Sequence, residues 1–157
     1  MDIKVLIEIT AGSNVKYEVD ASTGKLNVDR FLHTAMVYPF NYGSIEATRG
    51  KDGDPLDAMV LTSDPILPGS VIKVHSIGLL EMEDEGGIDT KILTVPDQKI
   101  DPVYGTITDI SQIPEATRAK IKHFFDHMKE LEPGKWVKTG AYQGPAAAED
   151  LINTSHV

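Results

Sequence analysis

Apolar and polar side chains alternate along the start of the chain. Every second residue from Ile3 to Ile9 is apolar, and the alternation resumes from Val15 to Val19 after a Gly-Ser-Asn turn at 12–14. A period of two is typical of a strand that buries one face. The pattern therefore predicts two strands joined by a hairpin-like turn.

Further short runs of the same kind follow, separated by turns that contain Pro and Gly. These runs predict strands at 26–31, 58–62, 71–80 and 90–95. Many short strands of this type favour a barrel or a strongly curved sheet.

The hydrophobic period changes in the last third of the chain. Apolar residues recur there at helical spacing, namely Ile121, Phe124, Phe125, Met128 and Leu131. The spacing predicts a helix that begins between 111 and 114 and ends at the Glu-Pro-Gly of 132–134. Pro145 followed by AAAEDL predicts a second, shorter helix over 145–152. The fold class is therefore β-rich α+β, and a length of 157 residues predicts one domain over 1–157.

The composition limits the kinds of molecule that the protein can bind. The formal net charge of −9 argues against a nucleic-acid backbone or an anionic membrane as partner, because both require a basic face. An anionic substrate fits only if metal ions lie between it and the acids. The chain has no cysteine, no secretory leader and no apolar run near the ~18 residues of a membrane span, so we expect a cytoplasmic location.

The stretch 52-DGDPLD-57 concentrates three carboxylates in one turn, which Gly53 and Pro55 favour. Two carboxylates about 5 Å apart repel by roughly 3 kcal/mol at an effective dielectric near 20. Either the acids splay into solvent or a cation holds them together. A second charged segment, 84-DEGGIDTK-91, favours the cation, since Asp89 and Lys91 are predicted to share a strand face.

Two rival interpretations of the acidic turn fail. A helix-loop-helix calcium site needs an oxygen ligand, Gly and Glu at its fifth, sixth and twelfth positions, where this chain has Leu56, Asp57 and Ser63. An aspartyl-phosphate nucleophile would be expected at the end of a hydrophobic strand, whereas EATRGK precedes this turn. His123 and His127 could bind zinc, but they lack the H-E-x-x-H pattern, and a subunit contact or a solvated helix face is the favoured interpretation.

With these residues assembled, the sequence resembles the soluble family I inorganic pyrophosphatases of the bacterial and archaeal short-chain type. The resemblance covers roughly residues 3 to 140 and centres on 52-DGDPLDA-58, with support from 16-KYEVD-20, 36-MVYPFNYGSIEAT-48, 84-DEGGIDTK-91 and 123-HFFDHMKELEPGKWVK-138. It implies a highly twisted, five-stranded OB-like barrel flanked by two helices from the C-terminal half. It also implies hydrolysis of inorganic pyrophosphate and a homo-oligomer, with a hexamer favoured.

The resemblance also implies residue roles. The metal ligands would be Asp52, Asp57, Asp84, Asp89, Glu18 and Glu8. The phosphate-binding groups would be Lys16, Arg30, Tyr42 and Lys129, with Lys91 and Tyr38 nearby. Asp54 would accept the proton of the attacking water, and Asp89 is the alternative acceptor. The implied cofactor is Mg²⁺, with Mn²⁺ or Zn²⁺ as substitutes and Ca²⁺ as an inhibitor; oxygen-only ligands favour Mg²⁺ or Mn²⁺ over Zn²⁺.

One position departs from the family pattern. Met128 stands where the family has a tyrosine that contacts phosphate, and Tyr104 or Tyr142 are candidates to replace it. Two other functions stay open at this stage: a non-catalytic barrel that binds metal or anions, and a phosphatase acting on organic phosphates.

Overall fold

The computed structural model describes residues 2–157. Within them the elements are, in order, β1 (Asp2–Ile9), β2 (Val15–Val19), β3 (Leu26–Phe31), β4 (Asn41–Ile45), β5 (Asp57–Val60), β6 (Val71–Asp84), β7 (Gly87–Ile88), β8 (Lys91–Pro96), η1 (Tyr104–Thr106), η2 (Ile110–Gln112), α1 (Glu115–His127), β9 (Val137–Gln143) and α2 (Pro145–Thr154). None of these helices is long and apolar enough to span a bilayer.

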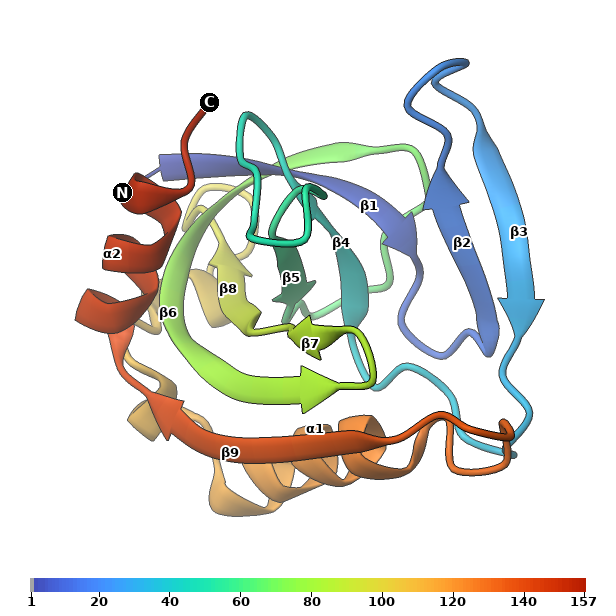
Figure 1. The fold of residues 1–157 in the computed structure, drawn as a ribbon. Coiled ribbons are helices and arrows are strands. Elements are labelled where there is room, and N and C mark those ends of the chain that lie inside the picture. Colours follow the sequence, from blue (N-terminus) through green and yellow to red (C-terminus); the bar gives the residue numbers. More distant parts are fainter. Residues whose placement is uncertain (1) are drawn as a thin grey trace.

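Five strands of the described chain form a closed ring in the order β1-β4-β5-β8-β6, and β6 returns to pair with β1 (Figure 1). Val5 of β1 shows the closure, because it pairs with Ile45 of β4 on one side and Ile72 of β6 on the other. The β5–β8 pair is parallel and the other pairs are antiparallel. The expected five-stranded OB-like barrel is confirmed. The long strand β6 curves around the barrel (Figure 1). β7 and β9 both pair with it and so extend the sheet beyond the ring of five strands.

The predicted pairing of the first two strands is wrong. β1 and β2 form where the alternation places them, but β2 pairs with β3 in a separate two-stranded sheet, beside the barrel in Figure 1. The turn between β1 and β2 is held by other parts of the chain: Gly12 N donates to Tyr38 O (2.8 Å), and Leu32 N donates to Asn14 O (2.8 Å). The connection therefore leads out of the barrel into the small sheet.

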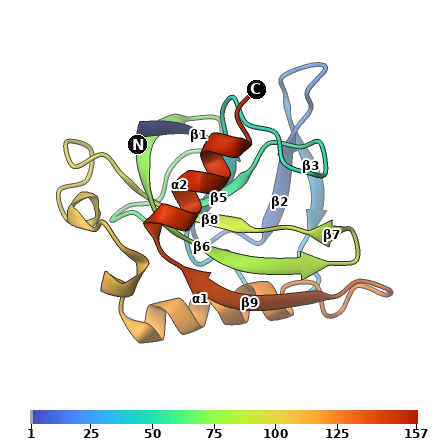
Figure 2. The same ribbon diagram turned by 60° about the vertical axis from the view of Figure 1, so that its left-hand side comes forward.

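The helices cover two sides of the barrel. α2 packs on β6 and α1 packs on β9 (Figure 2). Ile121, Phe124 and Phe125 of α1 are buried as the helical spacing predicts, and Met128 at the C-cap is buried with them. The predicted end of this helix at 132–134 is wrong: α1 ends at His127, and Leu131, which follows it, is 62% exposed.

Candidate active site

All the residues that the sequence predicts for the site line one cavity of about 510 Å³. The barrel supplies its base, the β2–β3 sheet one wall, and the segment after α1 another. The lining residues among the predicted set are Glu8, Lys16, Glu18, Arg30, Tyr38, Tyr42, Asp52, Asp54, Asp57, Asp84, Asp89, Lys91 and Lys129.

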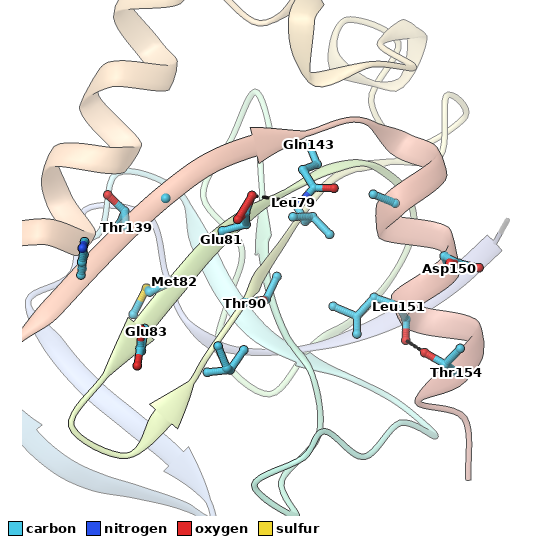
Figure 3. A pocket seen from close by; sticks show the side chains of 14 residues that line it. Leu79, Glu81, Met82, Glu83, Thr90, Thr139, Gln143, Asp150, Leu151 and Thr154 are labelled. Atoms are coloured by element: carbon cyan, nitrogen blue, oxygen red, sulfur yellow. Dashed lines mark hydrogen bonds between the residues drawn. The ribbon is translucent and has the colours of Figure 1, made fainter.

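A second cavity, of about 620 Å³, lies between β6, β9 and α2 (Figure 3). None of the predicted residues lines it. Two of its polar side chains already have protein partners: Gln143 Nε2 donates to Glu81 Oε1 (2.9 Å), and Thr154 Oγ1 donates to Leu151 O (3.2 Å). The predicted site residues therefore all lie in the other cavity.

Lys91 lies at the centre of the buried part of the site. Its Nζ donates to Tyr42 Oη (2.7 Å), Asp57 Oδ2 (2.8 Å) and Asp89 Oδ2 (2.9 Å), and its side chain is 4% exposed. The parallel pairing of β5 and β8 places Asp57 directly opposite Lys91. The alternation predicted that Asp89 and Lys91 share a strand face, but Asp89 precedes β8 and lies outside the strand. Its carboxylate still contacts the ammonium group of Lys91.

The two carboxylates around Lys91 have different electrostatics. Burial alone would raise the pKa of Asp57, but Lys91 outweighs this effect and holds the pKa below its usual value. At Asp89 burial raises the pKa, and the charge of Asp57 adds to it beyond what Lys91 offsets. Asp89 is thus a buried carboxylate that one lysine does not fully compensate, and a further cation would stabilise its charged form.

The acidic turn forms the rim of the cavity. Asp54 N donates to Asp52 Oδ1 (3.0 Å), and Gly53 has φ +89°, a conformation that glycine adopts without a steric penalty. Burial raises the pKa of Asp54, and the charges of Asp52 and Asp57 raise it further. A carboxylate with a raised pKa is a better proton acceptor than an isolated aspartate.

Glu8 is the most enclosed carboxylate of the predicted set. It accepts hydrogen bonds from Val19 N (3.1 Å) and Ser44 Oγ (3.0 Å), which fix both of its oxygens. Burial raises its pKa despite these bonds. Lys16 and Glu18 lie nearby on β2 and pair with each other.

Sequence reasoning missed three side chains that hold the predicted ones in place: Ser44, Glu85 and Glu132. Glu85 accepts from Lys129 Nζ (3.0 Å), which also donates to Asp84 (3.1 Å), and from Trp136 N (3.2 Å). The signal available in the sequence was position, because each of the three lies inside one of the blocks quoted for the resemblance.

The donor set fits a hard divalent cation. Eight carboxylates face the cavity, and the chain has no cysteine to favour softer metals. Among residues 2–157, no three His, Asp or Glu side chains are already gathered as a metal cluster. Lysines occupy the space between the acids instead: Lys91 lies between Asp57 and Asp89, and Lys129 lies against Asp84.

A small closed barrel with carboxylates and cations around one cavity defines a class of protein whose site has the chemistry to hold divalent cations and anionic groups together. Comparison with known proteins gives the family within this class. The model of the inorganic pyrophosphatase family matches residues 5–157. The chain therefore belongs to the inorganic pyrophosphatase family.

Individual relatives agree with this assignment. An inorganic pyrophosphatase of Aquifex pyrophilus is 57% identical over 143 residues, covering 91% of this chain and 81% of the relative. That of Nanoarchaeum equitans is 54% identical over 152 residues, covering 97% and 94%. The solved inorganic pyrophosphatase of Helicobacter pylori has a TM-score of 0.96 at 44% identity, and the alignment covers 98% of this chain and 91% of that one. The Thermus thermophilus structure gives 0.94 at 41% identity, covering 98% and 88%.

Proposed function

We propose that this protein hydrolyses inorganic pyrophosphate to two orthophosphates with the help of Mg²⁺. The observation that carries the proposal is that one cavity gathers every carboxylate, lysine, arginine and tyrosine of the predicted site, with Met128 at the position of the family's missing tyrosine. The alternatives of a non-catalytic barrel and an organic phosphatase explain this complete set less well.

Metal ions would be held by Asp52, Asp57, Asp84, Asp89 and Glu18, with Glu8 at the edge of the cluster. When bound, they supply water of lowered pKa and neutralise charge on the phosphoryl oxygens. Lys16 and Arg30 are partners in the β2–β3 register, so both cations are placed on one face of the small sheet. Together with Lys129 and Tyr42 they bind and orient the substrate.

In the reaction a water oxygen attacks one phosphorus, and the bond from that phosphorus to the bridging oxygen breaks. Asp54 accepts the proton from the water, since its raised pKa and its place on the rim suit that role. Asp89 is the alternative acceptor. Lys91 keeps Asp57 charged and in position.

Substitution of Asp57 tests the metal sites. Asp57→Asn removes the charge of a carboxylate that is proposed to bind metal and that pairs with Lys91. We expect phosphate release from pyrophosphate to fall by about a thousandfold or more at saturating Mg²⁺, the size of loss seen for catalytic groups that act as a unit. Asp64→Asn is the matched control, because Asp64 is exposed and outside the cavity. Near-normal turnover of the Asp57 variant would exclude the proposed ligand role.

A second assay separates the candidate functions. Phosphate release is measured side by side from pyrophosphate and p-nitrophenyl phosphate, with Mg²⁺, Mn²⁺, Zn²⁺ or Ca²⁺ as the divalent ion. We expect pyrophosphate to be the preferred substrate and Mg²⁺ the best activator. Ca²⁺ should inhibit, because its ligand distances of about 2.3–2.6 Å exceed the roughly 2.0–2.1 Å of Mg²⁺ and misplace the water. No release from either substrate would favour the non-catalytic barrel.

A homohexamer and a cytoplasmic location are also part of this proposal. Their support is the family to which the chain belongs and the absence of cysteine from the sequence.

A further inference from the structure

Glu132 is a buried carboxylate outside the set predicted to touch metal or substrate. Its side chain is 5% exposed. It lies in the turn that follows α1, where Glu132 N donates to Lys129 O (3.0 Å) and Lys135 N donates to Glu132 O (3.2 Å). The same turn therefore fixes Glu132 relative to Lys129, one of the phosphate-binding candidates.

The carboxylate of Glu132 reaches across to the small sheet. Its Oε1 lies 3.0 Å from Arg30 Nε on β3 and 3.1 Å from Lys135 Nζ. The Arg30 N–H does not point at this oxygen, and Glu132 Oε2 is buried with no hydrogen-bond partner.

The contacts of Arg30 within residues 2–157 leave one end of its guanidinium for a ligand. Nε faces Glu132 and Nη1 contacts Asp29, while Nη2 has no protein partner among the described residues. Arg30 lines the cavity and its side chain is 22% exposed. Two carboxylates thus hold the guanidinium from two sides, and the third nitrogen is left to donate to an anion.

We propose that Glu132 is the positioning residue for Arg30, and that its carboxylate aims the guanidinium at a phosphate group bound in the cavity. The inference rests on the proposed function in taking the anion to be a phosphate. Glu132 also ties the β2–β3 sheet to the turn that carries Lys129, so two cations from distant parts of the chain are held in one arrangement.

Stability alone is a weak reason for this ion pair. Buried charge pairs often contribute less to stability than apolar side chains of similar volume, because both charges must be desolvated. Burial alone would raise the pKa of Glu132, but Lys135 and Arg30 outweigh it and keep the pKa below its usual value, so the carboxylate is charged when it meets Arg30.

The test is a double-mutant cycle read by binding of inorganic phosphate. Isothermal titration in the presence of Mg²⁺ gives the affinity of the wild type, Glu132→Gln, Arg30→Met and the double variant. We expect Glu132→Gln to weaken phosphate binding roughly five- to tenfold, since a hydrogen bond that is lost or misaligned at a charged group accounts for a change of this order. In the Arg30→Met background the same substitution should change the affinity less than about twofold.

A merely structural role would give a different result. If Glu132 only stabilised the turn, Glu132→Gln would lower the melting temperature and leave phosphate affinity as in the wild type, or its effect would add to that of Arg30→Met; either outcome would overturn the proposal. Glu149→Gln, at an exposed position on α2, is the matched control and should bind phosphate normally.

Two further measurements make the test decisive. If Glu132→Gln does not fold, Glu132→Asp keeps the charge but withdraws it by one methylene, and wild-type phosphate affinity in that variant would equally reject the role.

With pyrophosphate as substrate, Glu132→Gln should raise KM with little change in kcat. A wild type that binds phosphate but does not hydrolyse pyrophosphate would contradict the proposed function and leave the binding cycle interpretable.

Discussion

Met128 lies at the border between the core and the active-site cavity. It is 6% exposed, belongs to the apolar cluster that contains Phe124 and Phe125, and also lines the cavity next to Lys129. The Met128 side chain is therefore part of the core and part of the cavity wall at the same time. The candidates to replace the missing tyrosine are wrong: Tyr104 and Tyr142 do not line the cavity, and Tyr142 Oη donates to Arg118 O (2.7 Å).

This position gives a prediction about substrate binding. Met128→Tyr would place a hydroxyl near bound phosphate, and we expect KM for magnesium pyrophosphate to fall roughly three- to tenfold with kcat little changed. The strain of fitting a ring into a packed site reduces the gain from the new hydrogen bond. A Michaelis series at fixed free Mg²⁺ measures both constants.

Met128→Leu is the control for this experiment, because it changes the side chain with little change in volume and should leave KM as it is. If a folded Met128→Tyr protein has the same KM as the wild type or a higher one, position 128 does not contact the substrate.

At the scale of elements, the position of β4 in the barrel depends on close contact between its backbone and the backbone of β1. A Cβ on Gly43 would lie 2.0 Å from Leu6 O, which is backbone and cannot rotate away. Gly43 also follows Tyr42, whose hydroxyl accepts from Lys91. The strand can therefore run at this depth in the barrel only if position 43 has no side chain.

We expect Gly43→Ala to destabilise the protein by about 3 kcal/mol or more, since overpacking against backbone forces the strands apart. For a chain of this length that corresponds to a fall of roughly 6–12 °C in Tm. Gly144→Ala is the matched control, because its Cβ would have Asp109 Oδ2 as nearest neighbour at 3.9 Å. Differential scanning fluorimetry compares the two variants, and equal melting temperatures would contradict the prediction.

Asp101 joins the segment after β5 to the turn that leads into η1. It accepts hydrogen bonds from Ser63 N (2.8 Å), Ser63 Oγ (3.0 Å), Val103 N (3.0 Å) and Tyr104 N (3.1 Å). Burial alone would raise the pKa of Asp101, but these donors outweigh it and the pKa lies below its usual value. The charged form is therefore the one that the fold stabilises.

The sign of the pH dependence follows from this shift. A carboxylate with a lowered pKa in the folded state contributes stability above its unfolded pKa of about 3.9 and loses it as the pH falls further. We expect Asp101→Asn to unfold more easily than the wild type at pH 7, by roughly 1–3 kcal/mol. Urea unfolding at several pH values should show this difference shrinking below about pH 4, and a constant difference would argue against the charge being responsible.

The local sequence pattern predicted those elements that bury one face and expose the other. β1 and α1 each bury a regular set of apolar side chains in the core, so their periods of two and 3.6 are visible in the chain. β4 reads NYGSI and is buried on both faces, which removes any alternation, and it was missed. Closure of the barrel through β1 and β6 depends on pairing between strands far apart in the chain, and the family resemblance, not the local pattern, predicted it.

The site residues also divide into those that the local sequence predicts and those that only the folded chain reveals. The acids of 52-DGDPLD-57 could be predicted because their density is unfavourable without a cation. The block 123–138 contains Glu132, but its pairing with Arg30 could not be predicted, because Arg30 lies on a strand far away in the sequence and only the folded chain brings the two together.

At the scale of the whole molecule, the active site joins three parts of the fold. The barrel carries Asp57 and Lys91, the β2–β3 sheet carries Lys16 and Arg30, and the segment after α1 carries Lys129. A change in how these parts are held together should therefore alter substrate binding before it alters the chemical step, because the phosphate-binding cations come from different parts.

The assembly of the molecule is a prediction that α1 can test. His123 and His127 lie on the side of α1 away from Phe124 and Phe125, with ring centroids 4.4 Å apart, and His127 pairs with Glu130 (2.8 Å). His123 is exposed and the His127 side chain is 43% exposed, which leaves this face available to a second copy of the chain. We expect the wild type to have a mass near six times the 17.1 kDa of the chain.

Replacing both histidines by glutamate would put two like charges per chain on this face, and charge repulsion and desolvation oppose association at such a contact. The double variant His123→Glu, His127→Glu should therefore form a smaller species at the same protein concentration, while His33→Glu, an exposed residue outside α1, should not change the mass. Light scattering coupled to gel filtration measures the masses, and circular dichroism checks that each variant is folded. A folded double variant that keeps the wild-type mass would show that this face of α1 is not a subunit contact.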